Sequence, residues 1–581
     1  MSVEQLITNH LDIWTAADTE KKSGRCRSSG NAGSVYGIKK LRELILELAV
    51  RGKLVPQDAN DEPASELLKR IATEKARLIA EGKIKKDKPL PVLESEEVVY
   101  ELPCGWNWVR FGEIAQHNSG KTLDSGRNTG TLHDYITTSN LYWGCFELAN
   151  VRQMPIRDEE FDKCSAKKGD LLICEGGEAG RAAVWFYEKD ICFQNHIHRA
   201  RFYCEIDPYY AYRFFEKLNA TGEINDHRKG VGISNMSGKA LASIAFPLPP
   251  LFEQHRIVAK VDELMALCDQ LENQHNNAAE AHEKLVTHLL GTLTQSQNAE
   301  DFSTHWQLIS KHFDTLFTTE ASIDALKQTL LQLAVMGKLV PQDLNDEPAS
   351  ELLKRIQAEK TKLIAEGKIK KDKPLAEITD DEKLFVLPDG WEWARLKNIV
   401  YILGDGLHGT PKYTENTGCY FVNGNNLQNG KIAIKHETKT VSLDEMEKHK
   451  KSLNERTVLV SINGTIGNVA FYNGENIILG KSACYFNLAH QIYKQYLKLL
   501  IESPYFIEYT KENVSGTTIM NLSLFSMNNF PLPIPPIEEQ KSIVAKVNEL
   551  MELCDQLKVR IIAANQLQQK LANVMVEQAT T

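Results

Sequence analysis

An internal repeat constrains the fold of this chain more than any other feature of its sequence. Residues 52–90 and residues 337–375 are identical at 34 of 39 positions, at a constant offset of 285. The same offset continues into the motif Leu-Pro-x-Gly-Trp-x-Trp-x-Arg, which begins at Leu102 and again at Leu387. A second repeated block, Phe-Pro-Leu-Pro followed by Ile-Val-Ala-Lys-Val, closes each copy at 246–261 and 530–547. The chain is therefore a tandem duplication in which two near-identical frames hold two inserts.

The two inserts, about 110–245 and 395–529, hardly resemble each other residue by residue, but their skeletons agree. Residues 171–180 form an apolar run that ends in Gly-Gly-x-x-Gly, and a second apolar run follows from Ala182. Residues 458–467 likewise end in Gly-x-x-Gly, and the next run starts at Val469. Each pattern predicts two short strands joined by a glycine turn. Duplicated frames with unlike inserts indicate one scaffold that presents two different recognition surfaces.

The frames are predicted to be helical. Apolar residues recur at spacings of 4-3-4-3 over 257–271 and 543–557, which is the seam of a coiled coil, and residues 38–48 and 323–333 could form the partner faces. The same seam also fits a core stripe in a helical bundle. A helix over 251–296 would be about 65–70 Å long, enough to hold two globular inserts apart. Pro63 and Pro348 predict the start of a further helix in each frame, and Gly82 and Gly367 predict its end.

Composition places the chain among ordinary multi-domain proteins. The 581 residues carry a net charge of −9, so the chain as a whole is not a basic nucleic-acid-binding protein. We find no signal sequence, no apolar run of membrane-spanning length and no cysteine pattern with zinc spacing, which predicts a cytoplasmic protein with reduced thiols. Residues 103–246 contain 17 Lys and Arg against 18 Asp and Glu, and residues 388–530 contain 14 against 13. The excess acidity therefore lies in the frames.

Three patterns are candidates for catalytic or ligand sites. Residues 115–122 satisfy a relaxed phosphate-loop pattern, but loop residues follow where a helix should begin. Asp207-Pro-Tyr-Tyr and Ser503-Pro-Tyr-Phe faintly resemble an amino-methyltransferase loop, yet each also fits the first turn of a helix. His196 and His198 flank one Ile on a predicted strand and would share a face, but further metal ligands are missing. We find no arrangement of nucleophile and base.

The inserts fit DNA recognition better. Asn can pair with adenine and Arg or Lys with guanine, although Asn also favours turns. Where the two inserts share a backbone pattern but differ in an exposed residue, that residue is a candidate for determining which DNA sequence is bound. In the glycine turns, Glu178 and Arg181 of the first insert correspond to Thr465 and Asn468 of the second. The ends of the inserts differ in the same way, and glycine allows close approach of the backbone to DNA. The predicted DNA-binding residues are Lys121, Thr122, Glu178, Arg181, Ser234, Asn235, Asn423, Asn425, Thr465, Asn468, Thr517 and Asn521.

Taken together, the duplicated frames, the Leu-Pro-x-Gly-Trp-x-Trp-x-Arg openings and the Phe-Pro-Leu-Pro closings resemble the specificity subunit of Type I restriction–modification enzymes. Residues 38–58 and their second copy resemble its enteric subgroup. The resemblance covers about 37–577, whereas the first ~35 residues match nothing and are expected to form an arm. It implies an α+β fold: two α/β target recognition domains separated by long antiparallel helices of a coiled-coil spacer, with internal pseudo-two-fold symmetry. The expected segments are the arm 1–36, a helical region 37–101, a first domain 102–250, a central helical region 251–386, a second domain 387–536 and a distal helix 537–581.

The resemblance also implies a function. Each variable domain would recognise one half of a bipartite, asymmetric sequence in double-stranded DNA. Independently of the resemblance, the approximate two-fold symmetry of the duplicated frames predicts half-sites about one helical turn, ~34–36 Å, apart. The chain itself would be non-catalytic, without cofactor or metal. Two modification subunits would use S-adenosylmethionine to methylate adenine N6, and two restriction subunits would use ATP and magnesium. The alternatives are a self-contained methylase or NTPase, and a coiled-coil adaptor whose inserts bind proteins.

Overall fold

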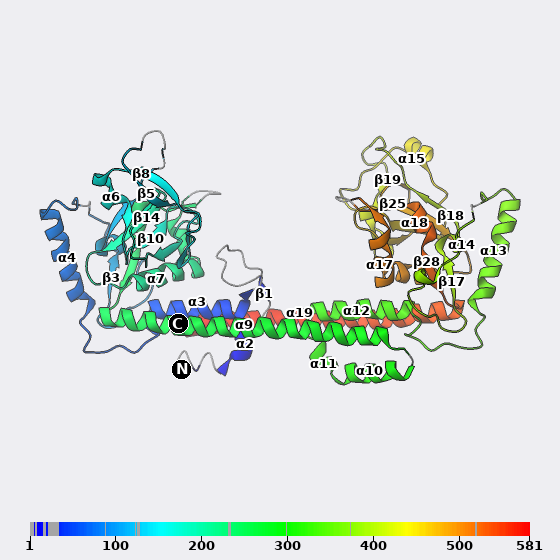
Figure 1. Cartoon of the computed structure of the whole chain (residues 1–581), viewed down its shortest axis with the longest axis horizontal. Helices are drawn as coiled ribbons and strands as arrows, with labels where there is room; N and C mark the ends of the chain where they lie inside the picture. Colours follow the sequence, from blue (N-terminus) through cyan, green and yellow to red (C-terminus); the bar gives the residue numbers. More distant parts are fainter. Residues whose placement is uncertain are drawn as a thin grey trace. The chain divides into compact units, whose positions relative to one another are not determined.

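The computed structural model describes residues 5, 9–15, 19–20, 34–86, 89–122, 124, 128–229, 234–297, 299–371, 374–516 and 520–580. Its contacts divide the chain into two compact units, Met1–Glu280 with Ala563–Thr581 (unit 1) and Ala281–Ile562 (unit 2). Each unit holds one insert and the helices that carry it, and unit 1 combines both ends of the chain (Figure 1). Within the described ranges, no helix is both long and apolar enough to cross a membrane.

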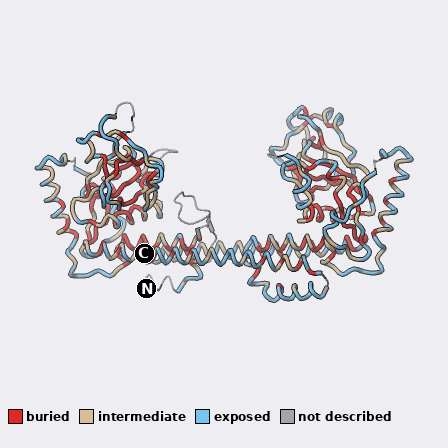
Figure 2. The backbone as a smooth tube through the Cα atoms, in the orientation of Figure 1, coloured by how far each residue is buried: buried red, intermediate tan, exposed pale blue. Residues whose placement is uncertain are grey.

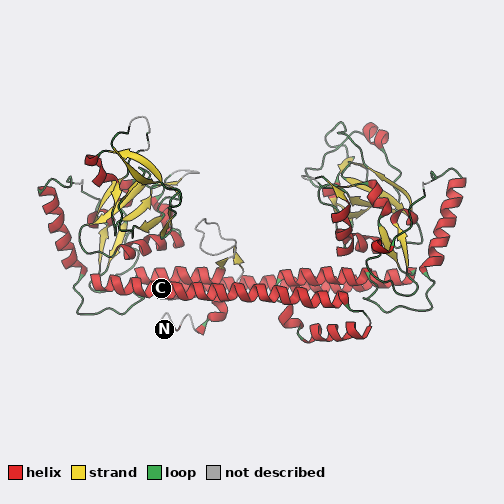
Figure 3. Ribbon diagram, viewed as in Figure 1, coloured by secondary structure: helices red, strands yellow, loops and turns green. Residues whose placement is uncertain are grey.

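The first insert is an α/β domain built on two four-stranded sheets (Figure 3). One sheet is antiparallel, in the order β12 (Ala182–Val184), β10 (Leu171–Cys174), β14 (Ile197–Phe202) and β4 (Ala115–Ser119). The other has the order β8 (Arg152–Ile156), β5 (Thr131–Ile136), β13 (Ile191–Phe193) and β9 (Ser165–Ala166), with β5 and β13 parallel. A separate pair, β3 (Asn107–Arg110) with β16 (Ala245–Leu248), ties the start of the insert to its end.

The second insert repeats this plan. Its antiparallel sheet runs β23 (Val469–Phe471), β22 (Thr457–Ser461), β25 (Ala483–Leu488) and β18 (Val400–Asp405), the same order as in the first insert. Strands β19 (Tyr420–Val422) and β24 (Ile477–Leu479) pair in parallel as β5 and β13 do, and β17 (Glu392–Arg395) pairs with β28 (Pro531–Ile534). The predicted strand–glycine turn–strand motifs are confirmed as β10–β12 and β22–β23. Two barely similar sequences therefore form one fold.

In unit 1 the predicted helical seam is confirmed. Helix α3 (Tyr36–Val50) packs against α9 (Leu251–Gln295), and the side chains at Ile38, Leu41, Ile257 and Val261 are completely buried in one cluster. Arg42 forms ion pairs with Asp269 and Glu272, while Gln57, later in the chain, contacts Glu253, earlier in α9. The two helices are therefore antiparallel.

Unit 2 uses the matching pair of helices. Helix α12 (Glu320–Val335) packs against α19 (Ile537–Thr580), with Ile323, Leu326 and Leu330 in the same apolar cluster as Cys554. Lys327 pairs with Asp555 at 2.5 Å and Lys558 with Asp324 at 2.8 Å, so these helices are also antiparallel. The end of α19 belongs to unit 1, where Ala572 is buried against the same cluster as α3.

Part of the expected N-terminal arm is integral to the core, which corrects that expectation. Helix α2 (Leu11–Thr15) packs on α3, and the side chain of Trp14 is completely buried. Gly37 allows this contact, because an added Cβ would lie 2.3 Å from the Trp14 carbonyl oxygen. Unit 2 contains a counterpart, α11 (Phe313–Leu316), which carries the buried Leu316 just before α12.

A side helix precedes each insert. Helices α4 (Ala64–Ala80) and α13 (Ala349–Ala365) begin after Pro63 and Pro348, as predicted. Each ends before a glycine with positive φ, +70° at Gly82 and +71° at Gly367, a conformation that favours glycine at helix ends. The amide at the start of each side helix donates to the carbonyl of the glycine in the Gly-Trp motif, as from Ala64 to Gly105 at 2.8 Å.

The repeated motifs form a buried contact between each insert and the start of its long helix, which we call the socket. The indole of Trp106 donates a 2.9 Å hydrogen bond to Glu253 at the start of α9, and Gln57 donates to the other carboxylate oxygen at 3.0 Å. Trp391 and Glu539 repeat the first bond at 2.9 Å in unit 2. Burial of polar groups is tolerated when they are hydrogen-bonded in this way. The Trp of the opening motif and the Glu of the closing motif are therefore structural partners.

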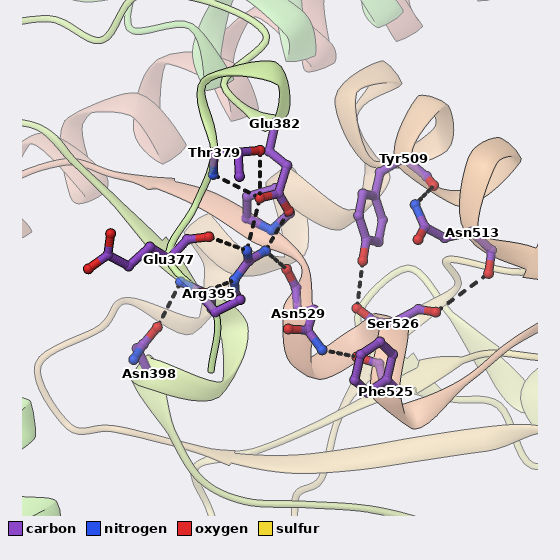
Figure 4. A network of polar contacts seen from close by, with 12 residues as sticks. Glu377, Thr379, Glu382, Arg395, Asn398, Tyr509, Asn513, Phe525, Ser526 and Asn529 are labelled. Atoms are coloured by element: carbon purple, nitrogen blue, oxygen red, sulfur yellow. Dashed lines mark hydrogen bonds and ion pairs between the residues drawn. The ribbon is translucent and has the colours of Figure 1, made fainter. Parts of the chain in front are cut away.

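The arginine of each opening motif closes the other side of the socket. Figure 4 shows Arg395 surrounded by Glu382, Asn529 and the backbone of Glu377. Its guanidinium binds both carboxylate oxygens of Glu382, at 2.7 and 2.9 Å. Arg110 forms the same paired contact with Glu97 in unit 1. This explains why the motif ends in arginine, since its planar guanidinium matches a carboxylate and several carbonyls at once.

Candidate nucleic-acid interface

In both inserts the glycine turn lies beside the end of the insert, the two places that sequence analysis identified separately. Strand β11 (Gly176–Gly177) pairs antiparallel with β15 (Ser234–Asn235). In the second insert Asn463 pairs with Asn521 in the same sense. The amide of Met236 donates to the Glu175 carbonyl at 2.8 Å, and Leu522 donates to Ile462 at the same distance. Two segments far apart in sequence thus form one surface in each insert.

The glycines of these turns differ in how much space surrounds them. Gly177 and Gly464 have φ of +78° and +75°, and no atom lies within 4 Å of the position that a Cβ would occupy. Gly180, by contrast, lies against Ile224, which a Cβ would approach to 2.1 Å. Positive φ favours glycine, and an open glycine lets the backbone approach a ligand closely. Gly177 and Gly464 therefore suit the DNA contact that the sequence predicted, whereas Gly180 has a packing role.

A third loop completes the surface, and only in the second insert were any of its residues, Asn423 and Asn425, among the predicted DNA-binding residues. The Asn140 side chain accepts from the Thr137 amide at 2.9 Å and donates to the Glu147 carbonyl at 2.9 Å. Asn426 forms the same two bonds, with Asn423 and Ala433, at 3.0 Å each. Both anchoring asparagines are buried. An Asn-Leu dipeptide occurs in both inserts, at 140 and at 426, and it could have revealed the loop from the sequence. Aligning the two dipeptides matches Thr137, Thr138 and Ser139 with Asn423, Gly424 and Asn425.

The third loop and the glycine turn are joined by a side chain that differs between the inserts. Arg181 donates to the Thr138 carbonyl oxygen at 2.6 Å, and Asn468 donates to the Gly424 carbonyl oxygen at 3.5 Å. Arg181 and Asn468, which the sequence predicted to correspond, therefore occupy equivalent positions in the two inserts. The backbone around them also matches, since the carbonyl of Arg181 accepts from the Cys174 amide and that of Asn468 from the Ser461 amide.

In the first insert this region forms a cluster of aromatic and charged groups. Glu178 accepts from the Trp143 indole at 2.7 Å and from Arg181 at 3.1 Å. The Arg181 guanidinium also lies 5.2 Å from the centre of the Tyr142 ring, a cation–π contact. The Arg181 side chain is only 15% exposed, whereas Glu178 is 46% exposed. Glu178 is thus the more accessible of the two charged groups.

In the second insert the described residues that match Glu178 and Arg181 are the uncharged Thr465 and Asn468, and amide side chains surround them. Asn423 accepts from Ser482 at 3.1 Å, and Asn463 donates to Asn521 at 3.3 Å. Asn425 and Thr465 are exposed on the surface. The second insert thus presents several amide and hydroxyl groups, which can both donate and accept hydrogen bonds.

Lys121 and Thr122 follow strand β4 of the first insert, where the Lys121 carbonyl accepts from the Asn195 amide at 3.0 Å. The Lys121 amine contacts both oxygens of Glu160 at 2.6 Å, and hydrogen bonds from Arg157 and Lys121 lower the pKa of Glu160 to about 2. The Lys121 amine is therefore engaged in an ion pair, while Thr122 is exposed. Asn235 is exposed beside the glycine turn. The backbone of Ser234 lies in β15, but its side chain and the whole of Thr517 lie outside the described residues.

The patterns considered as catalytic or ligand sites have structural roles. Residues 115–119 of the phosphate-loop pattern form β4 itself, and Gly120 leaves room for the Phe193 carbonyl, which a Cβ would approach to 2.0 Å. Asp207 caps helix α7 (Pro208–Thr221) by accepting from the Tyr209 amide, and Ser503 precedes α17 (Pro504–Asn513). Both prolines occupy the first helical turn, as predicted.

The two histidines do not form a pair. Strand β14 begins at Ile197, so the expectation that His196 and His198 share a strand face is wrong: His196 is exposed and His198 is buried. Nε2 of His198 lies 3.2 Å from the Met236 carbonyl, and burial lowers the pKa of His198. Over the residues with assigned structure, no group of three or more His, Cys, Asp or Glu could hold a metal ion.

Comparison with known proteins identifies both inserts. The model of the Type I restriction modification DNA specificity domain matches residues 103–281 and again residues 388–565. Among curated proteins, the chain is 40% identical over 607 residues to the Type I restriction enzyme EcoAI specificity subunit of Escherichia coli. It is 38% identical over 624 residues to the EcoEI specificity subunit of the same species. Both alignments cover 100% of this chain and of the relative.

Solved structures that match this chain include the HsdS subunit from Thermoanaerobacter tengcongensis. The TM-score is 0.41 at 17% sequence identity, and the match covers 83% of this chain and 98% of that chain. A chain from a structure of type I restriction–modification complex assembly gives a TM-score of 0.42, also at 17% identity, and covers 83% of this chain and 99% of that chain.

Proposed function

The chain belongs to the family of DNA specificity subunits of Type I restriction–modification systems, and we propose that its two target recognition domains each read one half of a bipartite, asymmetric DNA sequence. The recognition surface of each domain consists of the glycine turn, the end of the insert and the third loop. The observation that carries this proposal is the matched bond from Arg181 or Asn468 to the third loop, because the same position in one scaffold carries two different polar groups.

The chemistry of the two surfaces supports unlike half-sites. The first offers an accessible carboxylate at Glu178 beside the less exposed guanidinium of Arg181, groups that can pair with cytosine and guanine edges. The second offers amides at Asn423, Asn425 and Asn468, which can pair with adenine. A palindromic target would need two equivalent surfaces. Two dissimilar surfaces on one scaffold therefore favour an asymmetric target.

The remaining roles follow from family membership. We propose that the long helices space the two domains and bind two modification subunits, and that two restriction subunits complete the assembly. The modification subunits would use S-adenosylmethionine to methylate adenine N6, with the base flipped out of the duplex, and the restriction subunits would use ATP and magnesium. In this scheme the chain itself is non-catalytic, holds no cofactor, and acts in the cytoplasm, where the DNA lies.

A domain exchange tests the proposal. In one chimaera residues 102–250 are replaced by the corresponding domain of the EcoAI specificity subunit, and in the matched chimaera residues 387–536 are exchanged instead. Each chimaera is expressed with the modification subunit, and methylated sequences are mapped. We expect each exchange to alter one half of the target and leave the other half unchanged. If both chimaeras methylate the original sequence, the inserts do not choose the target; capture of protein but not DNA by the complex would favour the adaptor function.

A further inference from the structure

The tips of the two side helices share a surface that folding does not require. The tips, residues 81–86 after α4 and residues 366–371 after α13, are identical in sequence. All of these residues except Ile84 and Ile369 are exposed, as Figure 2 shows for the ends of both helices. The buried residues of α4 are Ala64, Leu67 and Ile71, all in its first half. Packing therefore explains the identity of the buried positions at the helix base but not that of the exposed tip.

The contacts between the side helices and their domains differ between the two units, although the tips are identical. Lys75 of α4 lies over the Tyr203 ring, with its amine 5.3 Å from the ring centre. The equivalent Lys360 of α13 is buried and donates to the Lys397 carbonyl at 2.7 Å. Each side helix thus rests on a different domain surface. The tips stay identical although the domain surfaces under the two side helices differ, which fits a common external ligand.

The tips are basic and adjoin a cleft in both units. In unit 1 a cleft of about 710 Å³ is lined in part by Lys83, Lys85, Lys86 and Lys163. In unit 2 the cleft of about 930 Å³ at the same place includes Lys371, Lys383 and Lys397. Lys83 and Lys368 pair with Glu81 and Glu366 of their own tips, at 2.8 Å each. For Lys85, Lys86, Lys370 and Lys371, by contrast, no ion pair joins them to any other described residue.

The lysines are not accounted for by the helix ends alone. The amides of Lys83 and Ile84 donate to the Leu78 carbonyl at 3.0 and 3.3 Å, so the last turn of α4 is already closed by the glycine cap. Unit 2 closes in the same way at Lys368 and Ile369. Lys85, Lys86 and their counterparts lie beyond this cap, where the helix dipole has little effect.

We propose that the side-helix tips bind the phosphate backbone of the DNA that flanks or spans the target, through Lys85 and Lys86 in unit 1 and Lys370 and Lys371 in unit 2. Phosphates are the same at every sequence, which fits identical tips beside unlike recognition surfaces. The domains themselves are close to neutral, with 17 basic against 18 acidic residues over 103–246. The tips therefore add sequence-independent attraction to domains whose net charge is close to zero. This inference rests on the proposed DNA recognition and adds a second contact to it.

The test measures how DNA affinity depends on salt. The full chain, purified with its modification subunit, is titrated with target and non-target duplexes at several salt concentrations. One variant carries four substitutions at the tips: Lys85→Ala, Lys86→Ala, Lys370→Ala and Lys371→Ala. We expect the slope of log affinity against log salt to fall by about 3 to 4, since each lost phosphate contact removes about 0.9. Affinity should fall equally for both duplexes, and the methylated sequence should not change.

A matched variant controls for total charge. It removes four exposed cations from the bases of the same helices, where each is paired with a glutamate. The substitutions are Lys69→Ala, Arg70→Ala, Lys354→Ala and Arg355→Ala. Equal slopes for the two variants would overturn the inference, as would loss of the modification subunit from the tip variant, which would assign the tips to a protein partner. A wild-type complex with no preference for any sequence would instead contradict the proposed function itself.

Discussion

Nη2 of Arg181 lies 2.6 Å from the carbonyl oxygen of Thr138 and donates a hydrogen bond to it. In the second domain the Nδ2 of Asn468 donates to the equivalent carbonyl, of Gly424. The two side chains join the same pair of loops, and each is placed at a recognition surface by a contact that requires only an N–H donor, which both residues supply. A scaffold of this kind can change specificity without changing fold.

Arg181 and Asn468 are predicted to affect opposite halves of the target. Arg181→Ala should reduce discrimination in the first half by about 1–3 kcal/mol, the amount typical of one specific base contact, and leave the second half unchanged. Asn468→Ala should do the reverse. Competition binding with duplexes altered in one half at a time measures this. Arg152, exposed on β8, supplies the control substitution, and unchanged preference in both variants would contradict the assignment.

The open glycines are predicted to matter for DNA more than for folding. Gly177→Ala should cost about 1 kcal/mol of stability because φ is +78°, and it should also place a methyl group on the recognition surface. Gly169→Ala is the matched control, since its φ is +92° and its surroundings are equally open. DNA binding and urea unfolding are measured for both variants. Equal loss of DNA affinity would show that Gly177 has only a conformational role.

The socket is predicted to stabilise its unit strongly. Trp106→Ala removes a nearly buried indole and leaves Glu253 without its 2.9 Å donor. Loss of a buried tryptophan costs about 3–5 kcal/mol. Urea unfolding monitored by circular dichroism should show an early transition in this variant. Trp306→Ala, at a side chain that is 37% exposed, should unfold nearly as the wild type does. A wild-type transition for Trp106→Ala would show that the socket contributes little.

The Arg395 network predicts a dependence of stability on acid pH. Hydrogen bonds from Arg395 lower the pKa of Glu382 to about 2, below its usual value near 4.5. The ionised carboxylate therefore favours the folded state, and this contribution is complete above about pH 5 and lost as the pH falls toward 2. Glu382→Gln should be less stable at pH 7 and lose less stability on acidification.

Glu377 provides the control for this prediction. It contacts Arg395 through its backbone carbonyl at 3.0 Å, and its carboxylate points away from the guanidinium (Figure 4). Glu377→Gln should therefore keep the wild-type pH profile. Unfolding free energies measured from pH 2 to 7 compare the three proteins, and parallel profiles for wild type and Glu382→Gln would contradict the role of the ion pair.

The sequence predicted those parts of the fold that repeat. The seams of the long helices, the ends of the side helices and the two glycine hairpins each follow from local spacing that occurs twice. The third loop of the first domain was missed because it depends on Asn140, a buried residue whose partners lie several residues away on both sides. Such tertiary hydrogen bonds leave no periodic pattern in a sequence.

Individual side chains were harder to predict than elements. Lysine is a residue type that commonly binds DNA phosphates, but the amine of Lys121 forms an ion pair with Glu160, 39 positions away in the sequence. Trp14 lies in a segment without any recognisable repeat and is nevertheless fully buried. Both outcomes depend on which distant residue folding brings into contact, and a single sequence does not contain that information directly. The candidate interface was therefore predictable as a set of loops rather than as a set of contacts.

The most direct test of the central claim is methylation mapping by long-read sequencing in cells that carry this chain and its neighbouring modification subunit. We predict one bipartite, asymmetric motif with an N6-methyladenine on each strand and a fixed nonspecific gap between its halves. The motif should disappear when the chain is deleted and the modification subunit is kept. Methylation that persists at the same sequence without this chain would contradict its role as the subunit that chooses the target.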